Sequence, residues 1–124
     1  MSMSIIHLFV YGTLRPGDVR WPILQPLVTG VGVADEVDGE LYDTGFDYPA
    51  AVFGGTGRIV GQTFELTSHT LDHALAVLDE EEGAVDGLYC RVAIRTRGGR
   101  DAWAYEYGAG LTLIPIASGD WFIR

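Results

Sequence analysis

Two features of this chain combine residue types and spacings that suit chemistry, and the first is a loop signal after an early apolar run. The segment 9–15 reads Phe-Val-Tyr-Gly-Thr-Leu-Arg, so the apolar run ends at Gly12 and the first cation is Arg15. This pattern is typical of a strand that opens into a backbone-lined loop, because glycine permits a positive φ or a close approach of another molecule. The amides from Gly12 to Arg15 can then converge on an anion or on a developing negative charge. Strand–glycine turns are common, so the signal needs support from elsewhere in the chain.

The second feature is a glutamate on the apolar side of a predicted helix. The sequence predicts a helix over residues 68–82, in which Leu71, Leu75 and Leu78 form an apolar stripe at about 100° per residue. Glu82 continues the i, i+4, i+7, i+11 series and falls in the middle of that stripe, whereas Glu80 points to the opposite side. We therefore predict that Glu82 alone among the acidic residues 79–82 points toward the core.

The predicted position of Glu82 disfavours its charged form. A carboxylate opposes the partial negative charge of a helix C-terminus, at a cost of ~0.3–1 kcal/mol. Partial burial and neighbouring acids also raise the pKa of a carboxyl group. Both effects suit a general acid–base group that exchanges a proton near neutral pH. From the pattern alone, the simpler interpretation is a helix that frays before Glu82 and leaves residues 79–82 as a solvated surface.

Composition narrows the classes of function. The 124 residues fit a single domain, 1–124, and the hydrophobic content of 48% favours a packed core. The net charge is −9 and all eight basic residues are arginines, so the chain is unsuited to nucleic acid and has no lysine for a P-loop or a Schiff base. Cys90 is the only cysteine, which excludes an intrachain disulfide and a cysteine cluster for zinc.

Nothing in the sequence directs the chain to a membrane. The first six residues have no basic n-region, and no segment approaches the ~20 apolar residues that span a bilayer. We expect a soluble cytoplasmic protein without a membrane partner, either monomeric or a weak homodimer. His7, His69 and His73 lack a metal-ligand pattern, and we expect His69 and His73 to lie on the surface.

Strands dominate the predicted elements, and one helix interrupts them. The sequence predicts a buried central strand at 5–10, an extended segment at 31–42, and two strands, 50–53 and 58–66, that flank a hairpin turn at Gly54–Gly57. A second hairpin pairs 89–96 with 102–107 across 97–100. Thr67 or Ser68 is placed to cap the helix, and Gly83 suits the position past its end. The residues expected to be buried are Phe9, Leu41, Phe64, Leu75, Leu78 and Trp103, and we expect Cys90 to be a packed thiol.

Several short blocks, in order along nearly the whole chain, carry a family resemblance. They are Val-Tyr-Gly-Thr-Leu-Arg at 10–15, Gly-Glu-Leu-Tyr-Asp-Thr-Gly at 39–45, Tyr-Pro-Ala at 48–50, Leu-Asp-Glu-Glu-Glu-Gly at 78–83 with Tyr89 and Arg91, and Ser-Gly-Asp-Trp at 118–121. With these blocks the sequence resembles the gamma-glutamylcyclotransferase-like family, which includes gamma-glutamylamine cyclotransferases. The blocks together are specific for the family and less specific for one substrate.

The resemblance implies a compact α+β fold, a small mixed β-barrel with one main helix beside it. It also implies a reaction without metal or cofactor, in which the α-amine of a γ-glutamyl compound attacks its own γ-carbonyl and releases 5-oxoproline and an amine. Matched to the family, Glu82 holds the catalytic acid/base position, and Tyr11, Gly12, Thr13 and Leu14 form the substrate-binding loop.

Two questions stay open at the level of sequence. The amides of the Gly12 loop suit either the α-carboxylate of the substrate or the developing oxyanion. We expect most aromatic residues to lie in the wall of the barrel, and Tyr105 among them to line the substrate cavity.

Some relatives contact substrate through a tyrosine near the C-terminus, and Leu-Thr-Leu-Ile-Pro at 111–115 offers none. A non-catalytic module that binds a γ-glutamyl or related anionic ligand is therefore the alternative to an enzyme.

Overall fold

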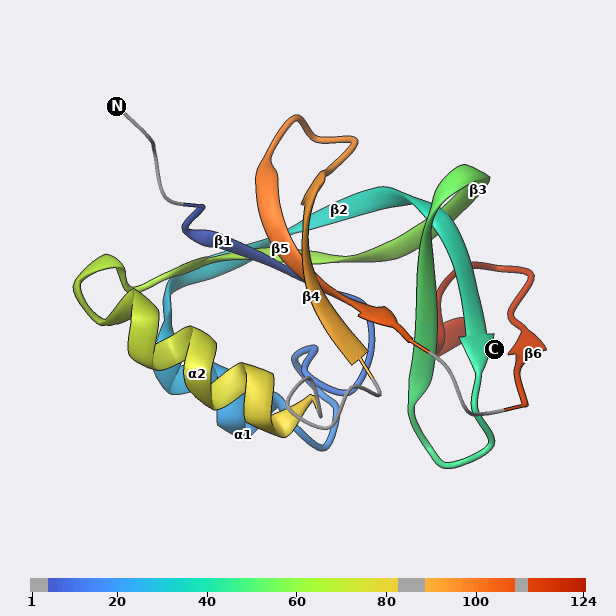
Figure 1. Cartoon of the computed structure of the whole chain (residues 1–124), viewed down its shortest axis with the longest axis horizontal. Coiled ribbons are helices and arrows are strands. Elements are labelled where there is room, and N and C mark those ends of the chain that lie inside the picture. Colours follow the sequence, from blue (N-terminus) through green and yellow to red (C-terminus); the bar gives the residue numbers. More distant parts are fainter. Residues whose placement is uncertain (1–4, 83–88, 109–111) are drawn as a thin grey trace.

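A six-stranded mixed sheet curls into a half-barrel in the computed structural model, which describes residues 5–82, 89–108 and 112–124 (Figure 1). The strands follow the order β4-β5-β1-β3-β2-β6, and β1 and β5 form the parallel pair among antiparallel neighbours. Their bounds are β1 (His7–Val10), β2 (Val28–Asp43), β3 (Pro49–Leu66), β4 (Tyr89–Arg95), β5 (Asp101–Tyr107) and β6 (Ile114–Pro115). Two helices accompany the sheet, α1 (Trp21–Leu24) and α2 (Leu71–Glu81). This architecture confirms the predicted α+β class.

Strand β1 lies at the centre of the sheet, as its apolar sequence predicts. It pairs with β3 on one side and with β5 on the other. Successive side chains of a strand point to opposite faces, and here both faces are covered. Leu8 and Val10 enter one core cluster, while Phe9 and Tyr11 enter another. The continuous apolar run of β1 therefore reflects burial on both faces of the sheet. Because β1 is a central strand, the loop that follows it begins in the middle of the molecule.

The hairpin predicted at Gly54–Gly57 is wrong, because β3 runs through these residues without reversing. Asp38 of β2 pairs with Arg58, and the next residue, Gly39, pairs with Phe53, so residues 54–57 form a bulge in one strand. Gly54 and Gly55 adopt φ values of 99° and 81°. Left-handed glycines serve a bulge as well as a turn, and sequence alone did not separate the two. The chain reverses at 44–48 instead, between the paired ends of β2 and β3.

The second predicted hairpin is confirmed. Strands β4 and β5 pair antiparallel from Tyr89↔Tyr107 to Arg95↔Asp101, with the turn at 96–100. Asp35 of β2 holds this turn, since its carboxylate accepts hydrogen bonds from the Gly98 amide at 3.0 Å and from Thr63 Oγ1 at 2.9 Å. Cys90 is exposed on β4, which corrects the expectation of a packed thiol.

Helix α2 begins three residues later than predicted, after the 3₁₀ turn Ser68–Thr70. The expected side-chain cap is not formed: no helix amide bonds to the side chain of Thr67 or Ser68 within the described residues, and Thr67 Oγ1 lies 3.3 Å from Thr29 Oγ1. The predicted terminal Gly83 lies outside the described residues. The remaining 3₁₀ turns are Gln25–Leu27 and Trp121–Ile123.

The helices pack on one cluster of the core. Leu75 and Leu78 of α2 and Leu24 of α1 join Leu8 and Phe64 there. The positions predicted to be buried are so at Phe9, Leu41, Phe64, Leu75 and Leu78. The prediction fails at Trp103, which is half-buried. Its side chain packs against the same core cluster, and the guanidinium of Arg91 lies over the ring, 4.4 Å from its centroid. Within the parts of the chain that the structure describes, no helix is long and apolar enough to cross a membrane.

Candidate active site

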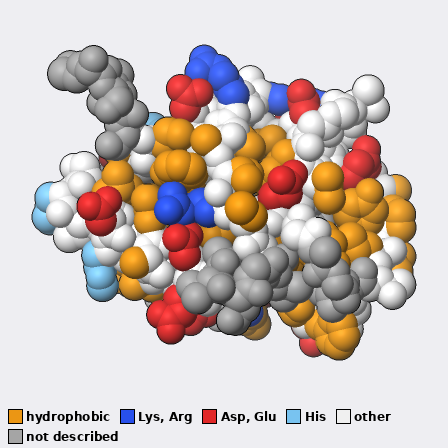
Figure 2. Space-filling view, viewed as in Figure 1, with side chains coloured by type: hydrophobic (Ala, Val, Ile, Leu, Met, Phe, Trp, Pro, Cys, Tyr) orange, Lys and Arg blue, Asp and Glu red, His pale blue; other side chains and the backbone are white. Residues whose placement is uncertain are grey.

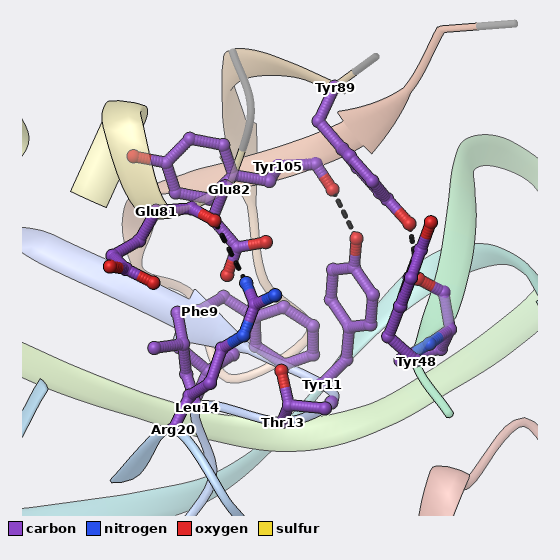
Figure 3. A pocket seen from close by; sticks show the side chains of 13 residues that line it. Phe9, Tyr11, Thr13, Leu14, Arg20, Tyr48, Glu81, Glu82, Tyr89 and Tyr105 are labelled. Atoms are coloured by element: carbon purple, nitrogen blue, oxygen red, sulfur yellow. Dashed lines mark hydrogen bonds between the residues drawn. The ribbon is translucent and has the colours of Figure 1, made fainter. Parts of the chain in front are cut away.

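A cavity of about 160 Å³ lies where the loop after β1 meets the C-terminal end of α2. Its walls also include residues of β4, β5 and the start of β3 (Figure 3). The lining residues are Phe9, Val10, Tyr11, Gly12, Thr13, Leu14, Arg20, Tyr48, Pro49, Glu81, Glu82, Tyr89 and Tyr105. All six site residues predicted from the sequence are among them. Arg15 is not, because its guanidinium pairs with Asp120 at 2.8 Å.

The loop after β1 contributes Gly12, Thr13 and Leu14 to the lining of this cavity, and most of its backbone amides are left without a partner in the part of the chain that the structure describes. The amide of Arg15 is not one of them, since it donates to the Gly12 carbonyl at 3.0 Å and closes a turn. The amides of Gly12, Thr13 and Leu14 have no hydrogen-bond partner among the described residues. The Thr13 carbonyl accepts the Arg20 amide at 2.8 Å, which fixes the far side of the loop. The set of candidate amide donors, predicted as Gly12 to Arg15, is therefore reduced to the amides of Gly12, Thr13 and Leu14.

Gly12 is required here for close packing. Its φ lies outside the left-handed region, unlike that of seven other glycines in the described chain. A Cβ at Gly12 would lie 2.5 Å from Cγ of Pro49, far inside the ordinary contact distance. Pro49 lines the cavity and its carbonyl accepts the Tyr89 hydroxyl at 2.6 Å, so it cannot move away without disturbing that wall.

Glu82 faces the cavity, as the helical periodicity predicts (Figure 3). Its amide donates to the Leu78 carbonyl at 2.9 Å, so the helical hydrogen bonding reaches Glu82 and the frayed alternative is wrong. The side chain is half-buried, whereas Glu80 and Glu81 are exposed. The buried Leu78, one turn earlier, places Glu82 on the inner side of the helix. The prediction that Glu82 alone among residues 79–82 points inward is wrong for Asp79, which is also half-buried and accepts a hydrogen bond from the buried Tyr105.

The surroundings of Glu82 bring its pKa to about 7. Burial is the main cause, because it disfavours the charged form. The Arg20 guanidinium opposes this shift and lowers the pKa, while Glu81 raises it further. A carboxyl group with this pKa releases and accepts a proton with similar ease near neutral pH.

Of the four tyrosines that line the cavity, three donate a hydroxyl hydrogen bond to another group of the protein. Tyr11 donates to the Tyr105 carbonyl, Tyr89 to the Pro49 carbonyl, and Tyr105 to Asp79 Oδ1 at 2.7 Å. Burial raises the pKa of all three hydroxyls, so they remain neutral phenols. Tyr11, Tyr89 and Tyr105 therefore form a fixed aromatic wall of the cavity.

Asp79 and Arg20 are the residues that sequence reasoning missed. Asp79 accepts both the Tyr105 hydroxyl and Nε of Arg91, the latter at 2.8 Å, and so holds the Tyr105 ring against the cavity. Its spacing of three from Glu82 was a usable signal, because i and i+3 lie on one side of a helix. Arg20 follows an irregular turn and reaches the cavity only through tertiary structure, so no local pattern marked it. Within the described residues, no group of three or more His, Cys, Asp or Glu is arranged to hold a metal ion.

Comparison with known proteins assigns the chain to a family. The sequence matches the family described as gamma-glutamyl cyclotransferase, AIG2-like, over residues 8–122. The chain belongs to this family. Its fold is shared by an uncharacterized protein from Pyrococcus horikoshii, with a TM-score of 0.72 and 26% identity over 95% of this chain and 90% of that one. A protein specific to uropathogenic E. coli has a TM-score of 0.72 and 21% identity over 96% and 94% of the two chains.

An AIG2-like protein from Mus musculus is a third structural neighbour. It has a TM-score of 0.64 and 17% identity, and the match covers 87% of this chain and 79% of that one. At this identity the likeness shows the fold. No curated protein matches the sequence.

Proposed function

We propose that this protein is a gamma-glutamylcyclotransferase that converts a γ-glutamyl compound into 5-oxoproline and a free amine. The observation that carries the proposal is Glu82, a half-buried carboxyl group with a pKa of about 7. It lines the same cavity as Gly12, Thr13 and Leu14, whose amides have no hydrogen-bond partner among the described residues. Family membership supports the reaction class, since the match spans residues 8–122.

The reaction suits a site whose principal polar groups are a proton carrier and amide donors. The α-amine of the substrate attacks the γ-carbonyl carbon, a C–N bond forms, and the original amide C–N bond breaks. The α-ammonium loses two protons on becoming the lactam N–H, and the departing nitrogen gains two on becoming an ammonium ion. Glu82 accepts a proton from the attacking nitrogen and delivers one to the leaving nitrogen.

The nucleophile and the leaving group both belong to the substrate, so the proposed reaction needs no enzyme nucleophile, metal or cofactor. The protein contributes orientation, because ring closure requires a folded substrate with its amine against the carbonyl. The cavity of about 160 Å³ lies below the ~300–1,000 Å³ of typical ligand pockets, which suits a folded glutamyl group. The aromatic wall of Tyr11, Tyr89 and Tyr105 limits the conformations of its methylene chain.

Product analysis tests this proposal. The wild-type protein is incubated with a panel of γ-glutamyl amines and γ-glutamyl dipeptides, and 5-oxoproline is measured by mass spectrometry. We expect 5-oxoproline and the free amine in equal amounts from at least one member of the panel. Binding of these compounds without release of 5-oxoproline from any of them would favour the non-catalytic binding module.

A further inference from the structure

Arg20 differs from every other arginine of the chain in its pairing. Seven of the eight arginines have a carboxylate oxygen within 4.0 Å, and Arg20 has none within the described residues. On the face shown in Figure 2, basic side chains accordingly lie beside acidic ones. In a protein of net charge −9, an arginine without a carboxylate oxygen within 4.0 Å is the exception among the described residues.

The position of Arg20 is fixed by two backbone contacts. Its amide donates to the Thr13 carbonyl at 2.8 Å, and its Nη1 donates to the Glu81 carbonyl at 2.9 Å. A guanidinium has five N–H donors, so these contacts leave donors available in a planar fork. Figure 3 shows the guanidinium beside the Glu82 carboxyl group at the cavity. Arg20 is the one cation that lines the cavity within the described residues.

We propose that Arg20 binds the α-carboxylate of the substrate, and this inference rests on the proposed cyclotransferase function. In a γ-glutamyl compound the α-carboxylate and the attacking α-amine share one carbon atom. A cation beside Glu82 therefore holds the carboxylate where Glu82 reaches the amine. Charge-assisted hydrogen bonds from a guanidinium fork match a carboxylate in geometry and are stronger than those from neutral donors.

This assignment also gives the loop amides a single role. With the α-carboxylate on Arg20, the amides of Gly12, Thr13 and Leu14 are left for the γ-carbonyl oxygen, where negative charge develops during attack.

The assignment of the α-carboxylate to Arg20 also predicts substrate selectivity. A γ-glutamyl compound whose α-carboxylate is converted to an amide would leave Arg20 without an anion and would bind poorly.

Ligand binding tests the role of Arg20 independently of turnover. Affinities for 5-oxoproline and for 5-oxoprolinamide are measured by calorimetry at pH 6 in wild type, R20Q and R58Q. The side-chain amide introduced in R20Q keeps a donor for the Glu81 carbonyl, and Arg58 pairs with Glu36 on the surface, so R58Q is the matched control. We expect wild type and R58Q to prefer the acid by roughly 10- to 100-fold, and R20Q to lose this preference with little change for the amide. Thermal unfolding of each variant verifies that it is folded.

Each result decides a separate question. A wild-type protein without preference for the acid, or an R20Q variant that keeps the preference, would overturn the role of Arg20 even if wild type releases 5-oxoproline. A preference that depends on Arg20, without release of 5-oxoproline, would support carboxylate binding by Arg20 and overturn the proposed cyclotransferase reaction.

A matched pair of substrates, γ-glutamylalanine and γ-glutamylethylamine, adds a further check. If R20Q impaired only the first, Arg20 would bind the carboxylate of the leaving group, contrary to the proposal.

Discussion

The hydroxyl of Tyr11 donates a hydrogen bond to the backbone carbonyl of Tyr105, inside the cavity that Glu82 faces. Tyr11 is the first residue after β1, and Tyr105 lies in β5, the parallel neighbour of that strand. Both side chains are buried. The bond therefore ties the beginning of the Gly12 loop to the sheet. The amides of Gly12, Thr13 and Leu14, which have no partner among the residues that the structure describes, follow directly after it.

Replacing Tyr11 by Phe removes this anchor while keeping the ring. The Tyr105 carbonyl then loses a buried donor, so we expect the free energy of unfolding to fall by ~1–3 kcal/mol in urea denaturation. We also expect a lower kcat for 5-oxoproline release, because the loop amides lose their fixed position. Y42F is the control, since Tyr42 lies outside the cavity lining. An unchanged stability in Y11F would contradict the anchoring role.

The raised pKa of Glu82 predicts a stability effect with a definite sign. Its pKa of about 7 in the folded protein exceeds the ordinary value of 4.5, so the folded state binds this proton more tightly than the unfolded state. The contribution to folding is thus fully present below pH 4.5 and is lost as the pH rises through 7. E82Q lacks this dependence, and we expect its stability relative to wild type to increase by roughly 1–3 kcal/mol across that range.

Urea unfolding of wild type, E82Q and E80Q at several pH values measures this effect. E80Q, altered at an exposed position of the same helix, is the matched control for the substitution itself. A pH-independent difference between E82Q and wild type would show that Glu82 ionises in the folded protein as it does in the unfolded chain.

The docking of α2 is tested at Leu75, which is buried in the core cluster with Leu78 and Phe64. Replacement of Leu75 by Ala removes packed methyl groups and leaves a cavity, so we expect the free energy of unfolding to fall by ~2–5 kcal/mol. His73 is exposed on the same helix, and H73A should change stability by less than about 0.5 kcal/mol. A loss below about half a kcal/mol in L75A would mean that the helix is not docked as described.

Periodicity predicted the parts of the site that depend on local structure. Helical spacing alone placed Glu82 on the inner side of α2, and the glycine after an apolar run marked the loop that faces it. Positions set by tertiary contact were not predictable in this way. Arg20 reaches the cavity through its contacts with Thr13 and Glu81, and neither contact has a signature in neighbouring residues. The bulge at 54–57 shows a related limit, since only the pairing of β3 with β2 distinguishes it from a turn.

The rate of 5-oxoproline release by E82Q tests the central claim most directly. Glutamine keeps the size of glutamate but cannot carry a proton, so on a substrate verified with wild type we expect a loss of ~10²–10⁴-fold, with ligand binding retained. E80Q, altered on the exposed side of the same helix, should release 5-oxoproline at close to the wild-type rate. Turnover by E82Q at the wild-type rate would contradict the assignment of Glu82 as the proton carrier.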